Sequence, residues 1–415
     1  MDTENVRMKK IASAAEGLRD WLTTTRRDFY MWPELSGNEV RTSGIVAERL
    51  RALGLEVQTG VGGYGVIGLL RGALNGPTVA WRADMDAFLT DDTLQTSYAS
   101  RVPGVKHVCG HDVHTTIGLG IANVLTSMRE SLAGSVKFIF QPAEETAVGA
   151  RAVVSDGGLE NPRPEVIFGL HVAPLPVGKV GCIPLTALPG WQTFQVLFQL
   201  GDGNLDFEAL AKAGIDAVCG LSTVQYPSNF DEFNALLQML ALGGEKVARN
   251  VFIQSWLVHG PNNQNIIGFG GILRANSETF SLEMLDAMKV TLDEVLAGVG
   301  YMMTLGDSLP AVVNDAGWEA ALRPVLEKVA GPENVLEVKA AFPYNGEDFS
   351  IYQQEIPGVF YWLGVANLER SITGIMHHPD FDVDEDCLVV GVNLMSNLLA
   401  NALEKCNFPA RTSPL

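Results

Sequence analysis

Four short segments concentrate the side chains that could do chemistry, and each lies at or just beyond the end of an apolar run. They are residues 81–86, with Asp84 and Asp86; residues 107–114, with Cys109, His111 and His114; residues 141–145, with Glu144 and Glu145; and residues 169–171, ending in His171. In open α/β sheets, ligands bind where the strands present their carboxyl ends. We therefore expect these four segments to converge on one site.

The residue types in these segments suit a divalent metal ion. Cys109 and His111 are two residues apart, so their side chains share one face of an extended loop. Thiolate, imidazole and carboxylate together suit zinc, or manganese in a site richer in oxygen. Glu144 and Glu145 are adjacent and project differently, so one can bind metal while the other acts as general base on a metal-activated water. The candidates for orienting the ligating rings are Asp86, Asp112 and His114.

Each of these features alone has a more ordinary interpretation. A single cysteine in a β-rich core is more often buried and inert than a ligand. An Asp-x-Asp pair after a strand is usually a turn or a cap, and adjacent glutamates usually form a solvated face. The combination favours a metal centre, because Cys-Gly-His-Asp-x-His is dense and its partners follow successive strands.

The elements around these segments indicate an α/β fold. Glycine-bounded apolar runs at 65–70, 78–83, 135–141 and 165–171 alternate with helical stretches such as 115–132. This pattern predicts a mixed-sheet domain covered by helices on both faces. The sequence pattern changes at residues 186–297, where we expect a helix at 231–242 and a strand at 250–257. The α/β pattern then resumes. We expect a catalytic domain in two parts, 1–185 and 298–415, split by an inserted, smaller α+β lid domain at 186–297.

Composition narrows the expected partners and compartment. Twenty-nine basic and 48 acidic residues give a formal charge of −19, which repels phosphate backbones and argues against nucleic acid. Five scattered cysteines form no disulfide framework, and the first residues lack an apolar core of secretory length, so we expect a cytoplasmic protein. The apolar stretch 388–403 is interrupted by Asn393, Ser396 and Asn397, which predicts a packed terminal helix and no membrane partner.

Taken in order, these motifs resemble the metallopeptidase family that contains carboxypeptidase G, the aminoacylases and, most similar here, the N-acyl-amino-acid and auxin-conjugate amidohydrolases. The resemblance runs from about residue 26 to residue 403. It is carried by Pro33-Glu34-Leu35-Ser36-Gly37, Arg82-Ala83-Asp84-Met85-Asp86-Ala87, Cys109-Gly110-His111-Asp112-Val113-His114, Gln141-Pro142-Ala143-Glu144-Glu145, Gly169-Leu170-His171, Gly346-Glu347-Asp348-Phe349 and His377-His378-Pro379.

The resemblance implies a role for each matching position. The implied metal ligands are Cys109, His111, Glu145, His171 and His377, which would hold one or two divalent ions, manganese or zinc, with cobalt as a further candidate. Glu144 matches the family's general base, and Asp86 matches the acidic residue that accompanies the metal ligands. Of the His-His pair, His377 matches the ligand position and His378 does not. Asn265 and Arg274 match lid positions that face a small-molecule substrate, and the lid often mediates dimerisation, so a homodimer is expected.

One departure concerns the substrate. Relatives carry a substrate-facing histidine near the start of the lid, in a Gly-x-Gly-Gly-His pattern. Here residues 201–205 read Gly-Asp-Gly-Asn-Leu, and no histidine occurs between His171 and His259. The metal chemistry is expected to be intact, whereas the substrate role of that histidine is vacant or has moved to another residue.

Three functions follow from these observations. The first is amide hydrolysis of an N-acyl amino acid, with Glu144 as base. The second is displacement of ammonia by water from an electron-poor aromatic amine, such as a substituted anthranilate. The third is a non-catalytic metal-binding protein, against which Glu144 argues, because a purely structural site needs no base.

Overall fold

The computed structural model describes residues 3–198, 206–222, 231–232, 235–236, 252–259, 266–275, 278–338 and 346–406. Packing contacts divide the chain into two units. The first comprises Met1–Pro184, Asn314–Glu337 and Ile351–Leu415, and the second comprises Leu185–Val313 and Val338–Ser350. The expected lid, residues 186–297, lies within the second unit, and the helix expected at 231–242 lies largely outside the described residues.

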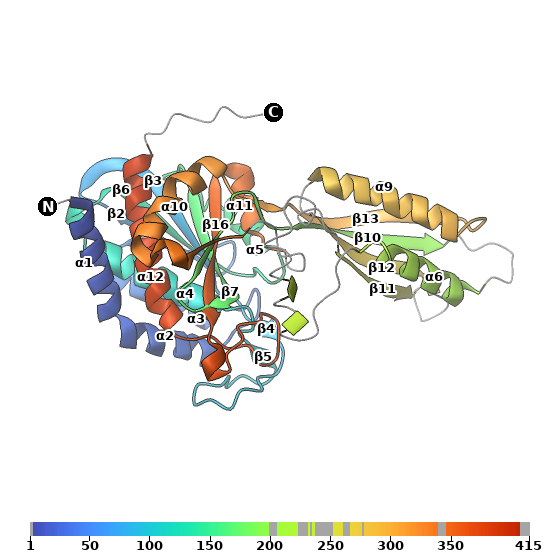
Figure 1. The fold of residues 1–415 in the computed structure, drawn as a ribbon, viewed down its shortest axis with the longest axis horizontal. Helices are drawn as coiled ribbons and strands as arrows, with labels where there is room; N and C mark the ends of the chain where they lie inside the picture. The colour runs from blue at the N-terminus through green and yellow to red at the C-terminus, as the bar shows by residue number, and fades with distance from the viewer. Residues whose placement is uncertain are drawn as a thin grey trace. The chain divides into compact units, whose positions relative to one another are not determined.

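The first unit is built on an eight-stranded mixed sheet (Figure 1). In spatial order its strands are β1 (Glu56–Val61), β2 (Gly65–Arg71), β6 (Ala133–Gln141), β3 (Leu74–Asp84), β7 (Ile167–Pro176), β16 (Gly358–Ala366), β8 (Val180–Cys182) and β15 (Val335–Glu337). The four central strands, β6, β3, β7 and β16, run parallel. Every residue of β16 is buried, as expected for a strand covered on both faces.

Helices flank this sheet and confirm the predicted α/β class. They are α1 (Thr3–Gly17), α2 (Arg19–Met31), α3 (Val40–Ala52), α4 (His111–Thr126), α5 (Gly149–Ser155), α10 (Ala316–Ala330), α11 (Phe349–Glu355) and α12 (Asp386–Lys405). Both α4 and α12 pack directly on the central strands and on each other. The predicted helix at 115–132 begins earlier than expected, at His111, so α4 itself carries two of the candidate histidines.

The terminal helix α12 is a core element. It is long and apolar enough to cross a membrane by length and composition alone, but 83% of its most hydrophobic window is buried inside the fold. Of the three polar residues that interrupt the stretch, Ser396 and Asn397 are fully buried, and the Asn397 amide donates to the Asn393 carbonyl at 2.9 Å. This agrees with the packed terminal helix expected from the sequence.

The second unit contains an antiparallel sheet with two helices packed on it (Figure 1). In spatial order its strands are β11 (Phe252–His259), β12 (Ile266–Ala275), β10 (Gly190–Phe198) and β13 (Tyr301–Leu309). The helices α6 (Phe207–Cys219) and α9 (Glu278–Val295) close a small apolar core around Phe194, Phe269 and Met288. Because β13 pairs with β10, this sheet also takes in residues beyond 297.

Candidate metal centre

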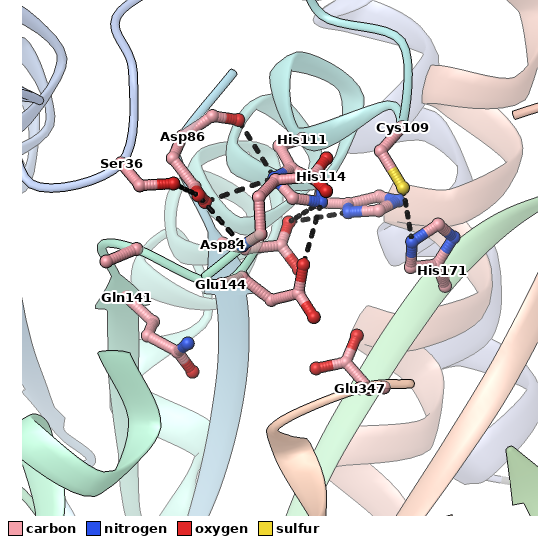
Figure 2. A network of polar contacts seen from close by, with 12 residues as sticks. Ser36, Asp84, Asp86, Cys109, His111, His114, Gln141, Glu144, His171 and Glu347 are labelled. Carbon is pink, nitrogen blue, oxygen red and sulfur yellow. Dashed lines mark hydrogen bonds and ion pairs between the residues drawn. The ribbon is translucent and has the colours of Figure 1, made fainter. Parts of the chain in front are cut away.

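The candidate site of the first unit forms where the central strands end. Asp84 is the last residue of β3, Gln141 is the last residue of β6 and is followed by Glu144 and Glu145, and His171 lies within β7. Parallel strands deliver these side chains to the same edge of the sheet. Figure 2 shows Asp84, Glu144 and His171 gathered at this edge, together with Cys109 and His111 from the start of α4.

Gly110 sets the direction in which the chain enters α4. Its φ of 85° lies in the left-handed region, and a Cβ at this position would come within 2.5 Å of a Val172 methyl. Only glycine allows both the turn and the close approach to β7. The turn leaves Cys109 before the helix and His111 in its first turn, with both side chains at the site.

The Cys109 thiol lies between two histidines that are distant in sequence. Its Sγ is 3.3 Å from His171 Nε2 and 3.1 Å from His377 Nε2. His377 Nε2 is in turn 3.7 Å from Glu145 Oε2, and His111 Nε2 is 3.7 Å from an oxygen of the neighbouring Glu144. The structure therefore brings together all the side chains that the resemblance implicates in metal binding.

These donors form two groups that share Cys109. One contains Cys109, His111 and His171, and the other contains Cys109, Glu145 and His377; within each group the ligand atoms lie within 4.8 Å of one another. Glu144 and Glu145 also approach His111 within that distance. The first group offers one sulfur and two nitrogens and the second offers sulfur, oxygen and nitrogen, and together they are a suitable donor set for zinc or manganese.

Hydrogen bonds orient two of the imidazoles for metal binding. Nδ1 of His171 donates to the carbonyl of Val172 at 2.8 Å, and Nδ1 of His111 donates to the carbonyl of Asp86 at 2.9 Å. Each ring therefore carries a proton on Nδ1 and directs Nε2 into the site. His111 Nε2 is buried and makes no hydrogen bond to any residue that the structure describes.

Asp86 lies beside the ligands, as the resemblance implies. Its carboxylate is 3.2 Å from His111 Nδ1 and accepts hydrogen bonds from Ser36 Oγ at 2.6 Å and from the Glu145 backbone N–H at 3.0 Å. Burial would raise the pKa of Asp86, but these bonds hold that pKa below its usual value. Asp86 thus stays ionised and fixes both the His111 ring and the backbone of Glu145.

His114 and Asp112 were also expected to orient the ligating imidazole rings. His114 supports the His171 ring only indirectly, and Asp112 bonds an arginine instead of a ligating ring. His114 donates from Nδ1 to Asp84 at 2.6 Å and accepts from the Val172 N–H at 2.9 Å, so it braces β7 next to His171. Asp112 instead bonds the buried Arg26 guanidinium at 2.6 Å, because the first turn of α4 directs it away from the ligands. Sequence reasoning missed Arg26, whose only signal was its position at the start of the resemblance.

Asp84 contributes more to the site than its sequence motif suggested. It is fully buried, 3.8 Å from His111 Nε2, and its other oxygen accepts a bond of 2.5 Å from Arg82. Although burial opposes ionisation, His111, His114 and Arg82 together hold the pKa of Asp84 well below its usual value. The Arg82-Ala83-Asp84 order in the motif was the signal for this pair.

The electrostatics of the site fit a bound cation. Burial raises the pKa of Cys109 well above its usual value, and burial with the Asp86 and Asp84 carboxylates raises the pKa of Glu145 to about 7. Glu145 Oε1 is buried and has no hydrogen-bond partner among the described residues. Ionised carboxylates and a thiolate are costly to bury together unless a positive charge accompanies them. A divalent cation between these donors supplies that charge.

Two residues of the site adopt strained backbone conformations. Ala143 has a φ of 54° and His377 a φ of 58°, in the left-handed region that side chains rarely occupy. The Ala143 N–H donates to Glu39 at 2.8 Å, and the His377 N–H donates to the Val108 carbonyl at 2.8 Å. Such strain, on the order of 1–3 kcal/mol per residue, persists where the surrounding structure holds it and is concentrated at functional sites.

The remaining positions singled out from the sequence are not among these donors. His378, the neighbour of His377, has a side chain that is 48% exposed and is absent from the donor groups of the described residues. Arg274 lies in β12 of the second unit, opposite Trp191 of β10. Asn265 and the Gly-Asp-Gly-Asn-Leu stretch at 201–205 lie outside the described residues.

Comparison with known proteins identifies the family. Residues 80–401 match the family described as Peptidase family M20/M25/M40. The chain is 32% identical over 401 residues to N-acetylcysteine deacetylase of Bacillus subtilis, covering 92% of this chain and 97% of the relative. It is 31% identical over 395 residues to IAA-amino acid hydrolase ILR1-like 4 of Arabidopsis thaliana, covering 92% and 86%.

A solved structure supports the same assignment. The YXEP protein of Bacillus subtilis, described as a dinuclear metal binding peptidase from the M20 family, superimposes with a TM-score of 0.75 at 29% identity, covering 94% of this chain and 99% of that protein. The fold, the donor groups at the strand ends and these relatives lead to one conclusion. The chain belongs to Peptidase family M20/M25/M40 and is a metal-dependent hydrolase of C–N bonds.

Proposed function

We propose that the chain hydrolyses the amide bond of a small N-acyl amino acid, with Glu144 as general base. The observation that carries this proposal is the pairing of Glu144 with Glu145 at the end of β6. Glu145 joins Cys109 and His377 in one donor group, while Glu144 lies 3.7 Å from His111 Nε2 and belongs to neither group that contains Cys109. One carboxylate can therefore hold metal while its neighbour handles a proton.

The proposed roles follow from this arrangement. Divalent ions held by Cys109, His111, Glu145, His171 and His377 would make a water more acidic and polarise the substrate carbonyl. Glu144 takes a proton from the water as its oxygen attacks the carbonyl carbon. Glu144 then delivers that proton to the nitrogen as the C–N bond breaks, so the products are a carboxylic acid and an amine. With only 8% of its surface exposed, Glu144 is shielded from competing bulk water.

Manganese or zinc, at one or two ions per subunit, is the metal that the donor set favours, with cobalt as a further candidate. The two donor groups around Cys109 support the higher count. The mixture of a thiolate, three imidazoles and a carboxylate is compatible with each of these metals.

We further propose that the protein acts on a small molecule in the cytoplasm as a homodimer formed through the second unit. All five cysteines are free, which suits a reducing compartment. β13 is an edge strand of its sheet, and its Met302 and Leu305 are each 50% exposed. An edge strand with exposed apolar side chains is a favourable surface for pairing with a second copy. The formal charge of −19 disfavours nucleic acid and anionic membrane surfaces as partners.

A second candidate, displacement of ammonia from an electron-poor aromatic amine, is favoured by one observation. Residues 201–205 hold no histidine where relatives have a substrate-facing one. A donor aimed at a carbonyl oxyanion is typically worth about 3 kcal/mol. A ring with an electron-withdrawing group takes up the developing charge itself as water adds at the carbon bearing the amine, and it needs no such donor. In this reaction Arg274 is proposed to bind a ring carboxylate through a bidentate pair.

A single substrate panel tests both candidates. N-acyl amino acids, auxin-type conjugates and substituted anthranilates are incubated with the metal-loaded protein, and free amino acid and ammonia are both measured. Turnover of N-acyl amino acids supports the amide hydrolase. Release of ammonia from a ring-substituted amine, with no free amino acid from any conjugate, would reject it in favour of the second candidate.

A further inference from the structure

A fully buried arginine, Arg26 of α2, binds two segments that carry proposed ligands of the candidate metal centre. Its Nε donates to Asp112 at 2.6 Å, and its Nη2 donates to Asp382 at 3.1 Å. Its Nη1 reaches Glu385 at 3.5 Å. A guanidinium presents donors in a rigid planar fork, so one side chain can bridge carboxylates from different elements.

The surroundings of Arg26 show that its charge is held in place from several directions. The guanidinium lies 4.6 Å from the centre of the Tyr30 ring and 5.1 Å from that of Tyr98. Tyr98 also donates its hydroxyl to Asp382 at 2.8 Å. A buried charge is retained only where paired charges and hydrogen bonds compensate its desolvation, and here both carboxylates and aromatic faces do so.

The two carboxylates that Arg26 binds are close in sequence to proposed ligands of different donor groups. Asp112 directly follows His111 in the first turn of α4. Asp382 lies in the segment 377–382, which begins with His377. His111 belongs to the group with His171, whereas His377 belongs to the group with Glu145. Arg26 thus connects, through the side chains of Asp112 and Asp382, the two segments that carry these groups.

The segment 377–382 has a conformation that requires external support. His377 itself has a φ of 58°, and its N–H is bound by the Val108 carbonyl. The fully buried Lys106 donates to the Pro379 carbonyl at 2.6 Å and is paired with Asp92 at 3.1 Å. Thr93 Oγ1 also donates to the Pro379 carbonyl at 2.9 Å and to Asp380 at 3.1 Å, and Asp382 is bound by Arg26. The segment is therefore held at several points, and the one at Asp382 connects it through Arg26 to Asp112 of α4.

We propose that Arg26 is a positioning residue that holds His377 at the distance from the His111 group needed to bind the second metal ion. This inference rests on the proposed metal ligands. Arg26 touches neither metal nor substrate, and it acts through Asp382 and the segment that carries His377. Loss of this connection is expected to weaken the Cys109/Glu145/His377 group while leaving the Cys109/His111/His171 group in place.

The test replaces Arg26 with lysine and compares it with a matched control. In Arg26→Lys the ammonium Nζ takes the place of Cζ, one atom beyond Nε. The buried charge and the pair with Asp112 are kept, whereas the planar fork that binds Asp112 and Asp382 through separate nitrogens is lost. The control is Arg27→Lys, at the next residue of α2, where Arg27 is 40% exposed, is paired with Glu385 and lies 4.7 Å from the centre of the Tyr98 ring. Asp382→Asn, which changes only the loop end of the connection, is the second variant if Arg26→Lys does not fold.

Metal-free proteins are titrated with Co²⁺, and binding is followed by calorimetry and by the cobalt–thiolate absorption of Cys109. Changes in residues that support metal ligands typically cost about 10–100-fold in metal affinity. We expect Arg26→Lys and Asp382→Asn to raise the Kd of the second ion by that factor and to leave the first ion unchanged. Arg27→Lys should match the wild type. Excess Co²⁺ should restore the turnover of Arg26→Lys, which would not happen if the variant merely unfolded the chain.

Two results would overturn the inference, and a third variant separates it from the proposed function. Wild-type binding of both ions by Arg26→Lys and Asp382→Asn would show that Arg26 does not position His377. An equal loss of both ions would make its role a general structural one. His377→Ala is titrated in parallel. If it also binds both ions normally, the ligand assignment itself is wrong, whereas loss of its second ion alone limits the failure to Arg26.

Discussion

Glu144→Gln is the most informative single change at this centre. Glutamine keeps the shape and hydrogen-bonding ability of Glu144, whose Oε2 lies 3.7 Å from His111 Nε2, but it cannot accept a proton. The neighbouring Glu145 remains available to the Cys109/His377 group. The substitution therefore removes the proposed base without removing a proposed metal ligand.

The magnitude follows from what a positioned base contributes. Proton transfer by such a group is worth about 10²–10⁴ in rate, or roughly 3–5 kcal/mol of activation free energy. Because the variant retains the donors that would bind metal and substrate, we expect kcat to fall by this factor while KM changes by less than about threefold. A loss confined to kcat corresponds to an interaction made in the transition state.

The assay measures turnover at saturating metal, with metal content determined by elemental analysis on the same samples. Glu145→Gln is the matched control, one residue away and of the same chemistry. It is expected to lose metal as well as activity, since Glu145 is a member of a donor group and its buried Oε1 has no partner among the described residues. Near wild-type kcat in fully metallated Glu144→Gln would refute the assignment of the base. An equal loss of metal in both variants would refute the division of labour between the two glutamates.

The remaining predictions concern the metal, acid stability and the turn before α4. Prolonged chelation should abolish activity and zinc, manganese or cobalt should restore it to differing degrees, whereas fully active protein without bound transition metal by elemental analysis would contradict the metal centre. Burial lowers the pKa of His107 to about 4. The His107 imidazole is protonated near pH 6.5 in the unfolded chain and only near pH 4 in the folded chain. The free energy of unfolding should therefore fall by about 3 kcal/mol as the pH falls from 6.5 to 4, and His107→Gln should reduce the pH dependence of the urea midpoint correspondingly. Gly110→Ala places a Cβ 2.5 Å from a Val172 methyl at a left-handed φ, so it should lower the free energy of unfolding by at least about 1–2 kcal/mol and also lower the metal content. An unchanged melting temperature would contradict this reasoning.

The overall fold and the composition of the centre were accessible from the sequence. Continuous apolar runs predicted buried parallel strands, and β16 is buried throughout its length. Parallel strands place their carboxyl ends at one edge of a sheet, so Glu144 and His171 could be expected together although they come from different strands. These inferences depend on local periodicity and on a general rule of sheet topology, and both are present in the order of the residues.

Other features depend on contacts that no local pattern encodes. The sequence suggested that Asp112 orients a ligating ring, but the first turn of α4 directs it to Arg26, from which it is separated by 86 positions. The sheet of the second unit takes in β13, because strand pairing with β10 rather than composition decides where that sheet ends. Propensity describes the neighbours of a residue along the chain, whereas these outcomes are set by which surfaces meet after folding.

By itself, the sequence determined the fold class, the residue types of the metal centre and the order in which strands deliver them. Only the tertiary structure decided that Cys109 lies between His171 and His377, which are 62 and 268 positions away, and that these donors form two groups sharing one thiol. It also assigned the imidazole protons to Nδ1, through carbonyl acceptors that the sequence does not reveal. The physical reason is that donor identity belongs to each residue, whereas donor distance and direction arise when distant segments pack against one another.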